Sequence, residues 1–128
     1  VFKKVPYAEP PLRFERALPK RPWAPAILHA TKWGSACIGA RTNVPESEDC
    51  LYLNIWVPNG GHADMPVVVY IHGGMNQHGS GQESYRQGDL LVQSAQHPTI
   101  FVNFDFRLGI FGWIEAEEEA GLPRNIGL

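Results

Sequence analysis

Residues 70–76 read Tyr-Ile-His-Gly-Gly-Met-Asn, a glycine pair that follows a run of β-forming residues. Glycine allows the backbone to turn sharply and to approach a ligand closely. Ligands bind at the carboxyl ends of strands in α/β sheets, and two successive backbone N–H groups there can donate to a developing oxyanion. That chemistry is acyl transfer. A tight turn without any ligand accounts for the same residues, since glycine pairs are common in turns.

The residues next to the other glycines and the histidines argue against nucleotide binding and metal binding. The segment from Gly79 to Gln82 lacks the Gly-Lys-Ser/Thr ending of a phosphate-binding loop, and Ser84 stands where a dinucleotide-binding motif needs a third glycine. His72 and His78 are six residues apart with no further ligand nearby, so no zinc site is predicted. We therefore expect neither a nucleotide nor a metal or other cofactor. The other three histidines are interpreted as solvent-exposed or turn residues: His29, His62 and His97.

Length and composition bound the remaining function classes. The chain has 128 residues, the size of one domain, and 44% hydrophobic residues, which is enough to build a core. A net charge of −2 argues against a nucleic-acid or anionic-membrane partner recognised by bulk charge. No apolar run approaches the length of a membrane span. The chain begins with Val1 rather than Met, which indicates processing or truncation.

Runs of β-forming residues, and the prolines that end them, predict the strands and the helix that must position the glycine pair. Strands are predicted at 51–57, which ends at Pro58, and at 67–71 and 99–104, whose continuous apolar runs are typical of strands buried on both faces. A short helix is predicted at 89–97, with Asp89 as its N-cap and a proline as its stop. Strand, helix and strand in this order predict a right-handed βαβ unit and a parallel sheet.

Two further segments have a weaker signal. Nine of the eleven prolines lie at or before Pro66, so the first fifty residues are expected to be extended and rich in turns, with little helix. The acidic run at 115–119 is a candidate helix. Cys37 and Cys50, the two cysteines, could be free thiols or one disulfide, and their spacing does not decide between these.

Several segments, taken in order, resemble the type-B carboxylesterase family, which includes the cholinesterases and some fungal lipases. The strongest is Ser47-Glu48-Asp49-Cys50-Leu51-Tyr52-Leu53-Asn54, which is similar to the family signature SEDCLYLN. The others are Val5 to Pro11, Leu12-Arg13-Phe14, Pro22-Trp23, Ala30 to Cys37, His72-Gly73-Gly74, Arg107-Leu108-Gly109 with Phe111-Gly112, and Asn125 to Leu128. A series of matches in the family's order is far more specific than the glycine pair alone.

The resemblance implies that residues 1–128 are the N-terminal portion of a single α/β-hydrolase domain, with a mostly parallel central sheet that is incomplete in this chain. It implies a disulfide between Cys37 and Cys50 and a buried ion pair between Arg13 and Glu48. It also implies a carboxylic ester hydrolase, either a serine carboxylesterase or a lipase, that is secreted and acts on small-molecule or lipid esters. The oxyanion-hole segment is then Gly73, Gly74 and Met75, of which the last two would donate their N–H groups.

The chain departs from the family pattern at several places. No serine has the flanking glycines of Gly-x-Ser-x-Gly, so the nucleophile, the acid and the histidine are all expected beyond Leu128. Met75 replaces a third glycine, and Asp105-Phe106 replaces the usual Asn-Tyr, which predicts altered hydrogen bonding near that strand end. The segment between the cysteines contains no Trp, which argues against cholinesterase specificity.

Two alternative functions follow from these departures. One is a non-catalytic relative, an adhesion or binding protein of the neuroligin type, and the other is a fragment without activity.

A sheet that lacks its later neighbours has an open edge. We therefore expect the isolated 128-residue chain to be poorly soluble or partly unfolded. The oligomeric state and the particular ester are not predicted.

Overall fold

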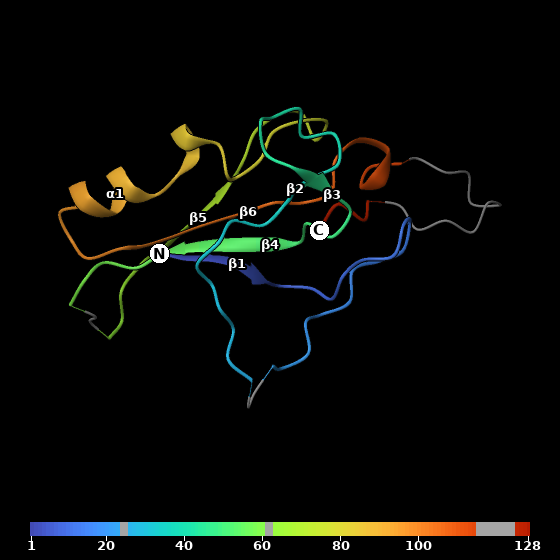
Figure 1. Cartoon of the computed structure of the whole chain (residues 1–128). Helices are drawn as coiled ribbons and strands as arrows, with labels where there is room; N and C mark the ends of the chain where they lie inside the picture. The colour runs from blue at the N-terminus through green and yellow to red at the C-terminus, as the bar shows by residue number, and fades with distance from the viewer. Residues whose placement is uncertain (24–25, 61–62, 115–124) are drawn as a thin grey trace.

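The computed structural model describes residues 1–23, 26–60, 63–114 and 125–128. Its main feature is a four-stranded sheet with the order β1-β4-β6-β5 (Figure 1). The strands are β1 (Phe2–Pro6), β4 (Tyr52–Trp56), β5 (Val67–Ile71) and β6 (Ile100–Phe104). The three strands expected from the β-forming runs are thus confirmed: β5 has the predicted bounds, β4 is shorter by one residue at each end, and β6 is shorter by one residue at its start.

The sheet is mixed. The pair β5 and β6 is parallel, as the strand–helix–strand pattern predicts, whereas β4 is antiparallel to both β6 and β1. Among the described residues one of the three strand pairs of this sheet is parallel, so this portion of the predicted sheet is mixed. β4 ends at Trp56 and β5 begins at Val67, and a connection this short reverses the strand direction, which makes β4 antiparallel to β6, the neighbour of β5.

The remaining elements are short. β2 (Ala36–Cys37) and β3 (Glu46–Ser47) form a two-stranded parallel sheet, and 3₁₀ turns lie at η1 (Ser84–Arg86) and η2 (Gly109–Phe111). Within the described part of the first fifty residues there is no helix, so the extended, turn-rich reading is confirmed. The candidate helix at 115–119 lies outside the described residues.

The helix α1 (Asp89–Ser94) is shorter than predicted. Gly88 rather than Asp89 is the N-cap, and Ala95 already has an extended backbone, so the helix ends before His97. The carboxylate of Asp89 accepts a hydrogen bond from Nε1 of Trp56, at 3.0 Å, instead of capping the helix. The prediction failed at the N-cap because a contact with a distant strand took the side chain that the local pattern assigned to the backbone.

Strand β5 is exposed, although its apolar run predicted burial on both faces. Its five side chains are 37–62% exposed. The physical reason is its position: β5 is the outer strand of the sheet, and α1 packs against β6 instead. An edge strand with unpaired backbone groups and apolar side chains is a site for association. Reduced solubility of the isolated chain stays a prediction.

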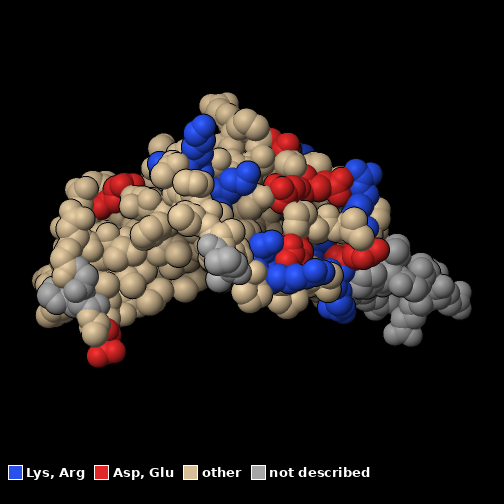
Figure 2. All heavy atoms as spheres, turned by 60° about the horizontal axis from the view of Figure 1, so that its bottom comes forward, with Lys and Arg blue, Asp and Glu red and all other residues tan. Residues whose placement is uncertain are grey.

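The charges are unevenly spread over the face in Figure 2. Charged side chains gather over one part of this face, and a broad neighbouring part has almost none. The near-neutral total charge of −2 is therefore made of local groups of opposite sign. None of the helices within the described ranges has the length and apolar character needed to cross a bilayer.

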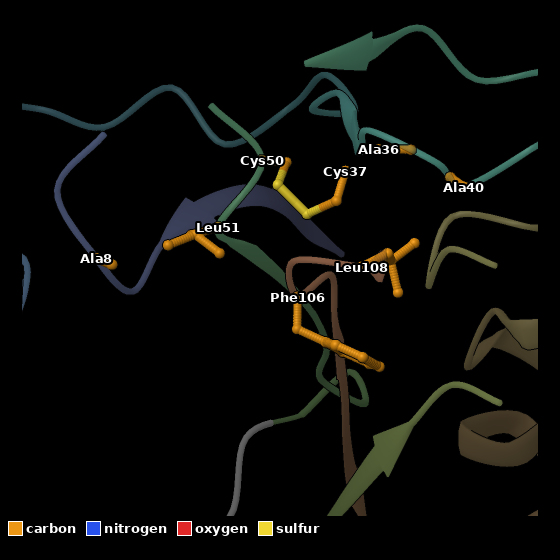
Figure 3. Packing of buried hydrophobic residues seen from close by; sticks show 8 residues of the cluster. All are labelled: Ala8, Ala36, Cys37, Ala40, Cys50, Leu51, Phe106 and Leu108. Carbon is orange, nitrogen blue, oxygen red and sulfur yellow. A yellow bond between two sulfur atoms is a disulfide. The ribbon is translucent and has the colours of Figure 1, made fainter. Parts of the chain in front are cut away.

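The core lies next to the two-stranded sheet and contains the disulfide (Figure 3). Cys37 and Cys50 are bonded, with their Cα atoms 5.0 Å apart and both residues at most 2% exposed. This confirms the pairing that the resemblance implied. The bond joins the extended N-terminal segment to the start of β4. The core side chains around it are Ala8, Ala36, Ala40, Leu51, Phe106 and Leu108.

Arg13 and Glu48 form the implied ion pair, but the pair is not buried. Nε of Arg13 donates to the two carboxylate oxygens of Glu48 at 3.0 and 3.2 Å. The side chains are 58% and 29% exposed, so burial was predicted wrongly. The hydrogen bond lowers the pKa of Glu48. Because the pair faces solvent, water screens its attraction and its contribution to stability is small.

Candidate active site

The sheet places two segments at the same edge. Strands β5 and β6 are parallel and in register from Val67 opposite Ile100 to Ile71 opposite Phe104. The chain therefore leaves both strands at one edge, where His72 follows β5 and Asp105 follows β6. This is the carboxyl edge of the parallel pair, the position at which ligands bind in α/β sheets.

The glycine pair continues into a turn with a left-handed backbone. Gly74, Met75 and Asn76 have φ angles of 135°, 56° and 57°. The carbonyl of Gly74 accepts hydrogen bonds from the N–H groups of Gln77 and His78, at 2.9 and 3.1 Å, and these bonds close the turn. Met75 is a non-glycine residue in a region that L-residues rarely adopt, which is the strain expected from the replaced third glycine.

Gly74 is required by packing as well as by its φ angle. A Cβ atom at this position would lie 1.8 Å from the carbonyl oxygen of His78. A Cβ at Gly73 would meet nothing within 4 Å. The two glycines are therefore not equivalent: Gly74 is needed for the turn to close, and Gly73 is not needed for steric reasons.

The turn leaves two adjacent donors free. In the described ranges of the chain, no hydrogen bond uses the N–H group of Gly74 or that of Met75. Met75 is 87% exposed. Two consecutive free N–H groups at the carboxyl edge of a sheet can bind an anion or a developing oxyanion.

A cavity adjoins the turn. Its volume is about 600 Å³, in the range of small-molecule sites. Met75 and Asn76 line one side, and apolar side chains from the segment that follows β6 line another. The lining also includes residues just after Cys37. The complete lining is Ile38, Gly39, Arg41, Met75, Asn76, Gln77, Leu108, Gly109, Ile110, Phe111 and Trp113.

Beneath the turn, His72 and Asp105 form a buried pair. Both side chains are 1% exposed, and Nε2 of His72 lies 3.8 Å from Oδ1 of Asp105. Nδ1 of His72 is 3.1 Å from the carbonyl oxygen of Gly73, and the ring stacks on Phe106 with centroids 4.4 Å apart. Burial lowers the pKa of His72 and raises the pKa of Asp105.

Asp105 is also tied to the loop that follows the turn. Its Oδ1 accepts the N–H of Gly81 at 2.9 Å, and its Oδ2 accepts Nε2 of Gln82 at 3.0 Å. Asn103, on β6, donates to the carbonyls of Gly81 and Arg86 at 2.7 and 2.9 Å. Asp105 thus has hydrogen-bond partners near the strand end, and these bonds fix the loop against the sheet; altered bonding relative to the family stays a prediction.

Sequence reasoning missed the pairing of His72 with Asp105. It considered His72 as a metal ligand and as the first residue of the His72-Gly73-Gly74 match, and Asp105 as a departure from the family. The signal was present, because each residue directly follows one of the two strands predicted to be parallel neighbours. Among the described residues there is no group of three or more His, Cys, Asp or Glu side chains that could hold a metal ion.

The comparisons with known proteins decide the family. The model of the carboxylesterase family matches residues 1–128. The chain belongs to the carboxylesterase family. It is 38% identical over 139 residues to the para-nitrobenzyl esterase of Bacillus subtilis, 36% over 144 residues to the acetylcholinesterase of Bungarus fasciatus, and 37% over 136 residues to the juvenile hormone esterase of Tribolium castaneum.

The three-dimensional structure of this carboxylesterase chain is also similar to that of a solved esterase. A solved PNB esterase superposes with a TM-score of 0.85 at 35% identity over 98% of the chain, which places the chain in the α/β-hydrolase fold. In each of the three sequence relatives the match covers 99% of this chain and 22–28% of the relative. The carboxylesterase chain thus spans about a quarter of the length of the relatives it matches.

Proposed function

We propose that the chain is the N-terminal portion of a single serine carboxylesterase domain and supplies its oxyanion-hole segment. The observation that supports this is the pair of free N–H groups at Gly74 and Met75, held at the carboxyl edge of the sheet beside a cavity. Gly73 leads the chain into that turn. The nucleophile, base and orienting acid are assigned to residues beyond Leu128. We call the polypeptide with both parts the complete protein.

The proposed reaction is hydrolysis of a carboxylic ester. A downstream serine attacks the acyl carbon, and a histidine oriented by Glu or Asp takes the serine proton and later gives it to the leaving alcohol. The N–H groups of Gly74 and Met75 stabilise the tetrahedral oxyanion, and one such donor contributes about 3–4 kcal/mol to the transition state. The reaction needs no cofactor. The apolar lining of the cavity fits the acyl part of a small-molecule or lipid ester.

We further propose that the protein is secreted. The disulfide between Cys37 and Cys50 supports an oxidising compartment, because such bonds are rare in the reducing cytosol. The two cysteines are buried in the core, so the bond belongs to the folded structure and is not a surface feature.

A non-catalytic relative of the adhesion type is the second candidate. The observation that favours it is Met75, whose exposed side chain stands in a strained left-handed position beside the proposed acyl site. The sequence downstream of Leu128 separates the two functions. A Gly-x-Ser-x-Gly motif with a later Glu or Asp and a His supports the enzyme, and a degraded set supports the adhesion protein.

A chimeric enzyme tests the proposed function. Residues 1–128 replace the matching segment of the Bacillus subtilis para-nitrobenzyl esterase, and turnover of p-nitrophenyl esters is measured. We expect the chimera to hydrolyse them and the isolated 128-residue chain to show no turnover. A chimera that has the circular dichroism and cooperative melting of a folded esterase, yet no activity, would contradict the proposal.

Met75 is predicted to influence the choice of acyl group. Met75→Gly removes a side chain that lines the cavity and relieves the positive φ angle, so we expect a changed ratio of kcat/KM between long-chain and short-chain p-nitrophenyl esters in the complete protein. A hydrophobic contact of this size changes such a ratio by about tenfold. Met75→Leu is the control that keeps an apolar side chain. Identical kinetics of Met75→Gly and the unmodified protein on both esters would show that Met75 does not contact the acyl group.

A further inference from the structure

The imidazole of His72 lies between two hydrogen-bond acceptors. Nδ1 is 3.1 Å from the carbonyl oxygen of Gly73, and Nε2 is 3.8 Å from Oδ1 of Asp105. Nε2 has no hydrogen-bond partner among the described residues. A neutral imidazole has one N–H group and cannot donate to both sides. To satisfy both acceptors, the pair needs one proton more than a neutral histidine and an ionised aspartate contain.

The acceptor on the Nδ1 side belongs to the peptide that bears the Gly74 N–H. The carbonyl of Gly73 and the N–H of Gly74 are parts of one planar unit, and in a trans peptide they point in opposite directions. A hydrogen bond from Nδ1 to that carbonyl therefore fixes the direction of the Gly74 N–H. The ring cannot turn away easily, because it is buried and stacked on Phe106.

We propose that His72 and Asp105 are positioning residues that share one proton, and that this proton aims the Gly74 N–H at the oxyanion. The inference rests on the proposed function, which assigns that N–H as a donor. While this proton stays on either Oδ1 of Asp105 or Nε2 of His72, Nδ1 keeps its own hydrogen and donates to Gly73. When the proton is lost, the remaining ring hydrogen moves to Nε2, which faces the carboxylate. The lone pair on Nδ1 then repels the Gly73 oxygen and releases the peptide.

The surroundings of the pair retain the proton. Burial is the main cause that lowers the pKa of His72 and raises the pKa of Asp105, and both directions favour a neutral carboxyl group beside a neutral imidazole. The charged groups that act on His72 from the neighbouring loop are Glu83 and Arg86, which have opposite effects on its pKa. On the other side of the sheet edge, the hydroxyl of Tyr7 donates to the backbone carbonyl of Asp105 at 2.9 Å.

The pH dependence follows from these two directions. Because folding raises the pKa of Asp105, the stability that Asp105 contributes falls as the pH rises above 3.8, the ordinary pKa of an aspartate. Because folding lowers the pKa of His72, the stability that His72 contributes rises with pH until the pH reaches 6.5, the ordinary pKa of a histidine. Between these two ordinary values the slopes therefore have opposite signs, and the two residues offset each other wherever both titrate in the folded protein.

The ring nitrogens of His72 give a direct test. In the complete protein with ¹⁵N-labelled histidine, we expect Nδ1 of His72 to stay protonated from about pH 5 to 7, whereas an unperturbed imidazole titrates near pH 6.5. This measurement needs no variant and no activity. A bare Nδ1 with the hydrogen on Nε2 at neutral pH, or an ordinary titration of His72, would overturn the proposal.

Asp105→Asn tests the consequence for catalysis. Asn keeps an oxygen acceptor for Gly81 but cannot hold the shared proton. We expect kcat for p-nitrophenyl acetate to fall about tenfold with little change in KM, because a misaimed donor loses part of its stabilisation of the transition state. We also expect Nδ1 of His72 to lose its hydrogen. Asp89→Asn is the matched control, since it removes a carboxylate that accepts a side-chain N–H far from the turn.

The outcomes separate the two proposals. An Asp105→Asn protein with unchanged kcat and a protonated Nδ1 contradicts the positioning role. If that variant does not fold, the ring nitrogens of the unmodified protein decide. If the complete protein hydrolyses no ester, the proposed function fails, while the state of Nδ1 still shows whether His72 and Asp105 share a proton.

Discussion

Gly74→Ala should reduce kcat of the complete protein by about 10²–10³-fold, the loss measured when one oxyanion donor is removed. The added Cβ would lie 1.8 Å from the carbonyl oxygen of His78, and Gly74 has a φ angle of 135°, which is a strained value for alanine. The turn must therefore open. Opening moves the N–H groups of Gly74 and Met75 away from the reacting carbonyl. Steady-state kinetics on p-nitrophenyl acetate measure the effect.

Gly73→Ala is the matched steric control. A Cβ at Gly73 meets nothing within 4 Å, so we expect this variant to melt at the temperature of the unmodified protein and to lose far less activity than Gly74→Ala. Equal losses in the two alanine variants would show that the closed turn at Gly74 does not hold the donors. A Gly74→Ala protein with normal kcat would contradict the oxyanion assignment itself.

Removing the disulfide is the second change with a large expected effect. In the complete protein, the double variant Cys37→Ala and Cys50→Ala should lower the free energy of unfolding by about 3 kcal/mol in the chain-entropy model. The bond closes a segment with a sequence separation of 13 and is buried among core side chains. Its loss frees the unfolded chain and also leaves unfilled volume in the core. Urea unfolding followed by circular dichroism measures the change.

The unmodified protein under reducing conditions is the control for this experiment. It loses the same covalent constraint but keeps both sulfur atoms, so its stability should fall between those of the oxidised protein and the double alanine variant. An unfolding midpoint that is the same in all three samples would show that the bond does not constrain the unfolded state. Kinetics on the folded variants then show whether the cavity beside Ile38 and Gly39 depends on the bond.

The local patterns predicted the backbone elements well. The apolar runs placed β4, β5 and β6, and the strand–helix–strand order predicted their one parallel pair. Helix α1 was predicted with the wrong cap because Trp56, distant in sequence, binds the carboxylate of Asp89. Burial was predicted least well. The same apolar run that places β5 in the sheet does not say how many layers cover it, and in this chain β5 is an exposed edge.

The sequence by itself determined the family motifs and their order and the glycine pair after a strand, and the family resemblance implied the disulfide that the structure contains. Only the tertiary structure decided that the Arg13–Glu48 pair faces solvent, that Gly74 and not Gly73 closes the turn, and that His72 meets Asp105. The physical reason is that residues close together in the sequence decide whether a segment forms a strand. Strand register and burial depend instead on contacts between residues that are distant in the sequence. Ile71 lies opposite Phe104 in the sheet, and that one pairing brings the next residue of each strand together in the core.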